Sequence, residues 1–265
     1  MGKNQTPEIP LTNISQIKRR MTLTFLTALV VFAYFFLQIN PLDIAAAFPE
    51  IIAFFKENFF PPNFRQFASY VPLILETLFF AVVATCLSAV ISVIFGLLMA
   101  EAINPVMPVR LAVRLIVSLI RNIPVLVWAS LLVYIFGIGS LVGILALILA
   151  TFGFLTRSYA EEMNAIAGSK LEALRAVGAS RTQLIVHGLI PEFFPAWINW
   201  TLFSFEINIR ASAILGMVGA GGVGILIQTN IRLFKYREAM SLIITLVILV
   251  LLTELCVNKV RKIIL

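Results

Sequence analysis

The stretch Asn122–Thr156 reads NIPVLVWASLLVYIFGIGSLVGILALILATFGFLT and contains no charged residue over 35 positions. A helix that crosses a membrane needs about 20 mostly apolar residues, so this stretch is too long for a single span. It is interrupted by Gly137-Ile138-Gly139-Ser140, a combination typical of a turn. We therefore predict a tight helical hairpin in a membrane, whose first helix begins before Arg121 and whose arms meet at this turn.

The rest of the chain has the same apolar character. Of its 265 residues, 60% are hydrophobic and 12% are charged, and the mean hydropathy is +1.00. A soluble domain averages about 25% charged residues, so these charges are too few to cover a water-soluble globule. The composition excludes a soluble fold and predicts an all-α, polytopic membrane protein.

Four more apolar stretches are long enough to cross a membrane. They are Met21–Ile39, Thr77–Ala100, about Phe193–Leu215 and about Ala239–Val257. With the two arms of the hairpin they predict six transmembrane helices. The first stretch could instead be the core of a cleaved signal peptide, since Ala45-Ala46-Ala47 follows it. Such cores have only about 7–15 residues, so we expect the stretch to stay as an anchor.

The basic residues set the expected orientation. Lys18-Arg19-Arg20 precedes the first span, which places the N-terminus in the cytoplasm, and six spans bring the C-terminus there too. Fourteen Lys and Arg residues then fall in cytoplasmic segments and five in external ones, the bias expected of membrane proteins. Residues 1–20 form a cytoplasmic segment and residues 21–265 the transmembrane domain. Residues 41–70 suit a short helix in the outer interface or an ordinary loop.

A compact polar stretch, EALRAVGASRTQLIVHGLIP at residues 172–191, lies in the segment Arg157–Pro191 between the fourth and fifth spans. Glu172–Val177 favours a helix, Gly178 is a typical C-terminal stop, and Ser180 can cap a following helix. We predict a helix, a glycine turn and a second helix that project into the cytoplasm. The residues alone leave open a solvated loop that merely links two spans.

The same stretch resembles the EAA signature of binding-protein-dependent ABC importer permeases. Glu172-Ala173, Gly178 and Ile190-Pro191 have the spacing of that signature, although Leu174 replaces its second alanine. Gly188 and Ile190 also stand where isoleucine and leucine are usual. In that family this segment, here about residues 157–191, contains the coupling helix that docks in a groove of the ATPase subunit. The resemblance implies that the ATPase contacts come from Glu172, Ala173, Arg175, Gly178 and Arg181.

Further motifs resemble the phosphonate-class permeases. FEINIR at 205–210 and VGAGGVG at 218–224 are together fairly specific for that group, and the likeness covers most of the chain after about residue 55. Arg121-Asn122-Ile123-Pro124 and Phe60-Pro61-Pro62 agree with it. The resemblance implies a bacterial cytoplasmic-membrane permease that imports phosphonate or a related phosphorus oxyanion. It implies two ABC ATPase subunits that bind ATP and magnesium, a second permease subunit, identical or paralogous, and an extracellular or periplasmic solute-binding protein.

Two charges interrupt the fifth span and are candidate pathway residues. On a helical wheel Asn199, Glu206 and Arg210 fall within about 40° of one another. The opposite face carries a second polar stripe, formed by Thr201, Ser204, Asn208 and Ser212. A charge at the bilayer centre costs about 2.5–3.5 kcal/mol on insertion scales. The two charges either neutralise each other as an i, i+4 pair or line the substrate pathway, to which we also assign Arg121.

The glycine motif at 219–224 formally matches a dinucleotide-binding fingerprint. That fingerprint needs a preceding strand and an acidic residue about 20 positions later, whereas this motif follows a membrane helix. Small residues allow helices and loops to approach closely in a membrane. We therefore predict packing at an outer gate or a dimer interface by Gly219, Gly221, Gly222 and Gly224.

Other chemistry finds little support in the sequence. There is no Walker A pattern, so we expect ATP to be bound by a separate subunit and no cofactor by this chain. His187 is the only histidine, and Cys86 and Cys256 lie apart in apolar runs, so we expect neither a metal site nor a disulfide. We find no catalytic cluster, and we expect membrane lipid but no nucleic acid among the partners. An ion channel remains an alternative, as does a different small solute.

Overall fold

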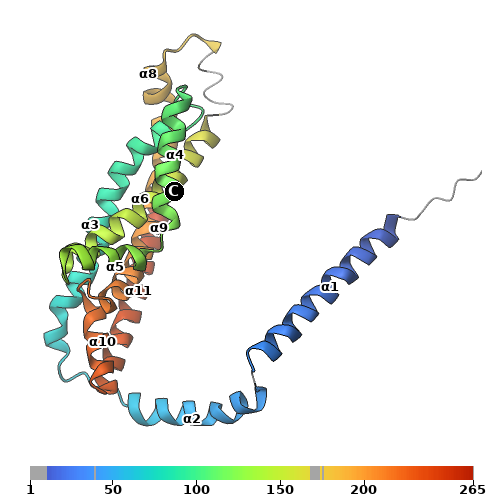
Figure 1. The fold of residues 1–265 in the computed structure, drawn as a ribbon. Coiled ribbons are helices and arrows are strands. Elements are labelled where there is room, and N and C mark those ends of the chain that lie inside the picture. Colours follow the sequence, from blue (N-terminus) through green and yellow to red (C-terminus); the bar gives the residue numbers. More distant parts are fainter. Residues whose placement is uncertain (1–10, 39, 168–173, 175, 265) are drawn as a thin grey trace, which may run out of the picture. The chain divides into compact units, whose positions relative to one another are not determined.

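The structure, a computed structural model, describes residues 11–38, 40–167, 174 and 176–264. Every regular element within these residues is a helix, which confirms the all-α prediction. The chain divides into two compact units, Met1–Glu57 and Asn58–Leu265, and each has its own helices (Figure 1).

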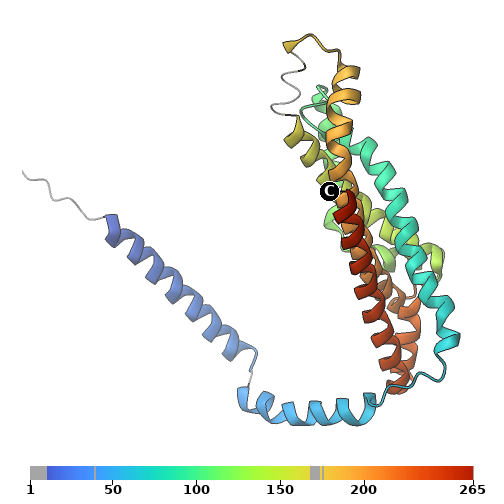
Figure 2. The ribbon, with the colours of Figure 1, turned by 180° about the vertical axis from the view of Figure 1, so that it is seen from behind.

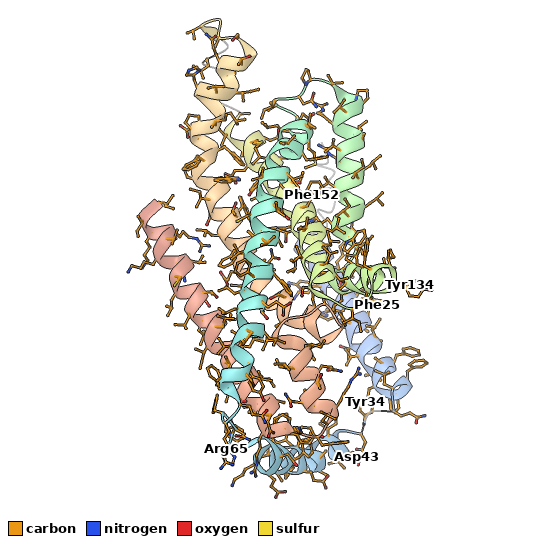
Figure 3. The ribbon with its side chains drawn as sticks, turned by 90° about the vertical axis from the view of Figure 1, so that its left-hand side faces the viewer. Phe25, Tyr34, Asp43, Arg65, Tyr134 and Phe152 are labelled. Carbon is orange, nitrogen blue, oxygen red and sulfur yellow. The ribbon has the colours of Figure 1, made fainter. Side chains whose placement is uncertain are left out.

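The first unit contains α1 (Leu11–Phe36) and most of α2 (Pro41–Phe59). The described side chains of α1 are exposed over almost its whole length, and Phe25 and Tyr34 project from it in Figure 3. A helix with apolar side chains exposed all round suits a lipid environment.

The helical nature of α2 answers a question that the sequence left open. Its first turn is capped by Asn40, whose Oδ1 accepts a hydrogen bond from the N–H of Leu42 at 3.1 Å. Residues 41–59 therefore form a helix rather than an ordinary loop. Its place in the outer membrane interface stays a prediction.

The centre of the second unit is the pair formed by α3 (Phe67–Met99) and α6 (Ser140–Ile166). The hydroxyls of Ser88 and Ser92 donate at 3.1 and 3.3 Å to α6 carbonyl oxygens, in each case 60 residues further along the chain. The constant separation shows that the two helices run in the same direction. At Gly96 an added Cβ would lie 3.2 Å from a side-chain atom of α6, so small residues permit this close approach.

The long helix α9 (Ile190–Met217) runs antiparallel to α6. The hydroxyls of Thr201 and Tyr159 lie 2.7 Å apart, and Thr151 Oγ1 donates to Asn208 Oδ1 at 2.9 Å. Residue numbers increase along α9 in the direction in which they decrease along α6. The two pairs also show which residues of α9 and α6 lie at the same height in the bundle.

The predicted hairpin is present, but its first arm is broken. It consists of α4 (Met107–Asn122) and α5 (Val125–Phe136), which meet at an angle of 88°. The break follows from Pro124, which lacks an N–H and disfavours a helical conformation in the residue before it. The predicted turn is confirmed, because α6 begins at Ser140 and Gly137 has a φ of +82°.

The remaining helices follow the polar stretch. α8 (Arg181–Gln183) and the π-helix η1 (Leu184–Leu189) lead into α9 without a break, so residues 181–217 are helical throughout. α10 (Val223–Arg232) and α11 (Tyr236–Ile264) come after α9, and α11 packs beside it (Figure 2).

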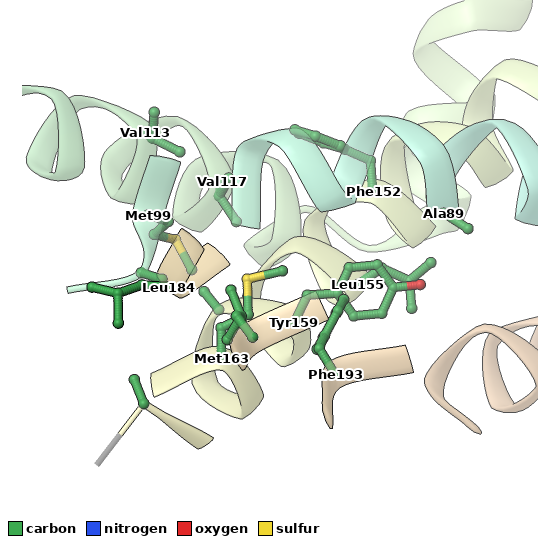
Figure 4. Packing of buried hydrophobic residues seen from close by; sticks show 14 residues of the cluster. Ala89, Met99, Val113, Val117, Phe152, Leu155, Tyr159, Met163, Leu184 and Phe193 are labelled. Carbon is green, nitrogen blue, oxygen red and sulfur yellow. The ribbon is translucent and has the colours of Figure 1, made fainter. Parts of the chain in front are cut away.

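A buried apolar cluster near the C-terminal end of α3 joins residues of α3, α4, α6, η1 and α9 (Figure 4). Leu155, Tyr159 and Met163 of α6 pack there with Val117 of α4 and Phe193 of α9. The rings of Tyr159 and Phe193 lie 5.3 Å apart at an interplanar angle of 84°, a favourable edge-to-face arrangement. The cluster fixes α4 and α9 on α6, and these helices carry the candidate site residues.

Four helical stretches are long and apolar enough to cross a membrane, and the bent α4–α5 pair would make a fifth. The four are 16–36, 67–99, 140–166 and 236–264. The structure thus supports four or five of the six predicted spans. The crossing by α9 and the cytoplasmic location of both termini remain predictions.

Candidate functional site

The two charges of the fifth predicted span form an ion pair along α9. Arg210 Nη2 donates to Glu206 Oε1 at 3.0 Å, across one helical turn. The Arg210 side chain is 49% exposed, whereas that of Glu206 is 15% exposed. The pairing is therefore real, and it leaves about half of the arginine available to a further group.

The opposite polar stripe of α9 faces the bundle. Ser204, Asn208 and Ser212 are buried. Asn208 accepts a hydrogen bond from Thr151 and donates one to Thr85 Oγ1 at 2.9 Å, which links α9 to both α6 and α3. This stripe therefore packs against neighbouring helices. In the other stripe Arg210 is exposed, whereas Asn199 and Glu206 are partly buried, and its place in the pathway stays a prediction.

Ser204 is the exception among these buried groups. Its hydroxyl has no hydrogen-bond partner, and it borders an apolar cleft of about 200 Å³ between α5, α6 and α9. Thr151 and Asn208 line the same cleft, but their polar atoms are already paired with each other. The cleft offers one free hydroxyl and otherwise apolar walls, a weak basis for binding an anion.

Arg121, which the sequence grouped with the α9 residues, lies elsewhere. It is in the last turn of α4, against Gly153 of α6, where an added Cβ would lie 3.0 Å from the Arg121 Cα. Gly153 follows Thr151 by two residues, or about 200° around the helix, so it faces away from α9. The structure therefore does not bring Arg121 together with Arg210, and it borders a different cleft, with Arg114 and Arg157.

The glycine motif forms a tight loop between α9 and α10. Gly219, Gly221 and Gly222 have φ values of +98°, +84° and +72°, which glycine adopts at little cost. The loop is tied to the hairpin turn, since Gly139 N–H donates to the carbonyl of Gly219 at 3.1 Å. Gly224 lies directly on the backbone of α9. All four glycines serve close packing at this end of the bundle; their role in a gate or a dimer interface stays a prediction.

Glu76 holds the same loop, and the sequence analysis missed it. Its carboxylate accepts hydrogen bonds from the hydroxyl of Ser140, at the start of α6, and from the N–H of Gly222 at 3.2 Å. The neighbouring Thr77 accepts from the N–H of Val223 at 2.8 Å and so caps α10. The signal was available, because Glu76 is an acid at the edge of a long uncharged run.

The predicted coupling segment is described only in part. Glu172, Ala173 and Arg175 lie outside the described residues, and nothing is established for the side chain of Arg181. Gly178 has a φ of +84°, and the N–H of Ala179 donates to the carbonyl of Leu174 at 3.1 Å, a backbone arrangement typical of a glycine helix stop.

The second helix of that segment starts with a reciprocal cap. Ser180 N–H donates to Gln183 Oε1 at 2.8 Å, and Gln183 N–H donates back to Ser180 Oγ at 3.4 Å. This is the capping-box arrangement, which fixes the chain direction at a helix start. The glycine stop and the serine cap are thus present as predicted. The contact with an ATPase is a separate matter that these residues do not test.

The described residues were also searched for a cluster of metal-ligating side chains. No three His, Cys, Asp or Glu side chains lie there close enough together to hold a metal ion. His187 is exposed in η1 and borders a shallow groove beside Gly178.

The chain is similar to a known family and to several curated proteins. The family model for the binding-protein-dependent transport system inner membrane component matches residues 92–264. A phosphite transport system permease protein of Stutzerimonas stutzeri is 29% identical over 202 residues, which are 76% of this chain and 74% of that protein. A putative cryptic phosphonate transport system permease protein of Escherichia coli is 34% identical over 118 residues, 44% of this chain and 97% of that protein.

A solved structure agrees with these relatives. The inward-facing MetNI methionine ABC transporter contains a chain that matches 74% of this one with a TM-score of 0.65 and 26% identity, over 96% of its own length. The family match covers more than half of the present chain, and it includes α6, α9 and the glycine loop. The chain belongs to the binding-protein-dependent transport system inner membrane component family and is a permease subunit of an ABC importer of the phosphonate class.

Proposed function

We propose that this permease imports phosphonate or a closely related phosphorus oxyanion through a pathway that the exposed face of α9 lines. The observation that carries the proposal is the Glu206–Arg210 pair. Its arginine is half exposed on a helix whose other polar face is locked into the bundle. Relatives named for phosphite and phosphonate transport support this cargo class.

The arginine suits such a cargo. A phosphonate carries one to two negative charges, and a wholly apolar passage would impose a large desolvation cost on it. A guanidinium presents a planar fork of donors that matches the oxygens of such an anion. Glu206 holds the fork in place and reduces its net charge, which keeps the anion from binding too tightly to leave.

The assembly needs subunits that this chain lacks. In the proposed importer a second permease, identical or paralogous, completes the pathway in a bacterial cytoplasmic membrane. Two ATPase subunits bind ATP and magnesium and dock on the coupling segments, and an external solute-binding protein delivers the anion. α5 exposes large apolar side chains that lipid or a second permease would cover; Tyr134, which is 92% exposed, projects from it in Figure 3.

The proposed orientation has six spans with both termini in the cytoplasm. α9 crosses the membrane from the coupling segment outward, which places Arg210 about 25 Å along it from Phe193. Arg210 then lies in the outer half, near the point where a binding protein releases its cargo. ATP binding closes the ATPases, moves the coupling segments and opens the pathway outward, and hydrolysis resets it.

Uptake of methylphosphonate by cells that produce the permease, its ATPase and its binding protein tests the proposal. We expect uptake that stops when the Walker A lysine of the partner ATPase is replaced. Uptake that continues without a functional ATPase would instead favour the ion channel. Absence of uptake for methylphosphonate, phosphite and phosphate, with the complex assembled, would point to a different solute.

A further inference from the structure

A second group of basic side chains lies between α4 and α6, away from the charged pair of α9. It borders a cleft of about 430 Å³, here called the arginine cleft. Three residues of α4 and three of α6 define it: Arg114, Ser118, Arg121, Arg157, Glu161 and Asn164. We propose that the arginine cleft binds a phosphorus oxyanion, as a site separate from Arg210.

Among the described residues the positive charges in the cleft outnumber the negative ones. Arg157 Nε donates to Glu161 Oε1 at 2.6 Å, and this acid is the only carboxylate among the described residues that line the cleft. Within the described residues neither Arg114 nor Arg121 has a carboxylate within 4.0 Å. Three guanidinium groups therefore face one carboxylate, which leaves a net charge of +2 open to an anion.

The first arginine of α4 provides an internal comparison. Arg110 lies 3.8 Å from the carboxylate of Glu101 and donates to the carbonyl oxygens of Glu101 and Asn104, both at 3.3 Å. The chain thus satisfies Arg110 by itself. Arg114 and Arg121 lie seven residues apart, which is close to two full helical turns, so they present their donors to the same cleft.

The cleft is also held in shape. The close backbone contact at Gly153 fixes the position of Arg121 on α6. The side-chain Oδ1 of Asn164 accepts a hydrogen bond from the N–H of Ala102 at 3.1 Å. This bond fixes the side-chain amide and leaves its NH₂ group as a donor. Donors positioned in this way lose little entropy when an oxyanion binds.

The size and place of the cleft fit the proposal. About 430 Å³ accommodates roughly a dozen water molecules, and so a small oxyanion that keeps part of its hydration. The cleft runs along α6 from Arg157 to Asn164. It therefore lies at the height of the Tyr159–Thr201 pair in the bundle, and not at that of the Thr151–Asn208 pair. In the proposed orientation this is the cytoplasmic half, a position that rests on the proposed function.

Two sources share the ligand chemistry, a transported oxyanion and the headgroup of an anionic phospholipid. The test uses the assembled complex in dodecyl maltoside, which contains no phosphorus. Phenylglyoxal modifies accessible guanidinium groups, and mass spectrometry of peptides reports the rate at each arginine. One sample receives methylphosphonate, another receives phosphatidylglycerol, and a third receives sodium chloride at matched ionic strength.

We expect methylphosphonate or phosphatidylglycerol to slow the modification of Arg114 and Arg121 severalfold, and to leave Arg232, outside the cleft, unchanged. Protection by methylphosphonate identifies a free oxyanion, and protection by phosphatidylglycerol alone identifies the headgroup. In Arg121→Gln the concentration that protects Arg114 should rise about tenfold or more, the ratio expected for a lost charge-assisted hydrogen bond. Lys259→Gln, which removes a charge outside the cleft, should leave it unchanged.

Equal modification in all three samples overturns the proposal. So does full protection in sodium chloride alone, because a partner subunit would then cover the cleft. These results are independent of the proposed function. If the complex imports no phosphorus oxyanion but either probe protects the arginines, the transport proposal fails and the cleft stands. If import is normal and neither probe protects, the cleft fails and the transport proposal stands.

Discussion

Arg210 and Arg121 have the same side chain, but the structure places them in different surroundings. Arg210 has an acid one turn away and a half-exposed side chain. Arg121 has no acid within 4.0 Å among the described residues and is fixed by a glycine contact instead. Because an arginine in a membrane protein is costly unless it is paired, solvated or used, each of the two environments is informative.

Replacement of Arg210 separates a structural pair from a transport residue. We expect Arg210→Gln to reduce oxyanion uptake strongly, by about tenfold or more, because it removes charge-assisted hydrogen bonds to the cargo. The swap Glu206→Arg with Arg210→Glu keeps an ion pair but places a carboxylate at the outer position, so its uptake should stay low. Uptake is measured at equal membrane levels; recovery in the swap would mean that the pair is only structural.

Thr151 tests the polar link in the bundle. Thr151→Val keeps the shape of the side chain but removes the donor to Asn208, so the free energy of unfolding should fall by about 0.5–1.5 kcal/mol. Thr253→Val is the matched control, since that hydroxyl bonds only to carbonyls of its own helix. Denaturation midpoints in detergent measure both, and equal small effects would show that the link contributes little.

At the scale of elements, the hairpin has two breaks, of which the sequence predicted one, the turn between its arms, and missed the other, the bend within its first arm. The turn at Gly137–Ser140 was predictable, because glycine and serine clusters interrupt helices by themselves. Pro124 carried an equally local signal, but the uncharged run around it favoured one continuous span. The 88° angle between α4 and α5 and the contact of α4 with Gly153 of α6 are arrangements in space that no single stretch of sequence reveals.

The glycine turn of the coupling segment gives a prediction for one element. Gly178 has open space around it, so any effect of substitution comes from its positive φ rather than from crowding. Gly178→Val should lower substrate-stimulated ATP hydrolysis by the assembled complex severalfold, whereas Gly178→Asn should be mild, because asparagine tolerates this conformation. Ala179→Val is the neighbouring control. Normal stimulation in Gly178→Val would remove the turn from coupling.

For the whole molecule, the sidedness of the polar stretch and of the α10–α11 connection decides the proposed orientation. Single cysteines at the exposed positions Ser180 and Lys235, in a background without Cys86 and Cys256, should react with impermeant reagents from opposite sides. Labelling in intact and opened membrane vesicles measures this. Reaction of both positions from one side would contradict a crossing by α9.

Composition and local signals predicted the helical class, the cap at Ser180 and the two stripes of α9. They did not predict the contacts of Glu76 with Gly222 or of Asn208 with Thr85, which join residues 146 and 123 positions apart. Such contacts depend on which helices become neighbours and at what level. The sequence analysis also assigned Arg121 to the same pathway as Arg210, whereas the packing of α4 on α6 places Arg121 at a different cleft.

The unbroken helical run from residue 181 to residue 217 acts as a lever if it tilts about the link between Asn208 and Thr151. Its arm toward Arg181 is about 40 Å long and its arm toward Met217 about 13 Å. A tilt of about 5° would then move the coupling end by about 3.5 Å, the glycine loop by about 1 Å the opposite way, and Arg210 hardly at all. The mechanical ratio is about three to one, with the arginine close to the fulcrum.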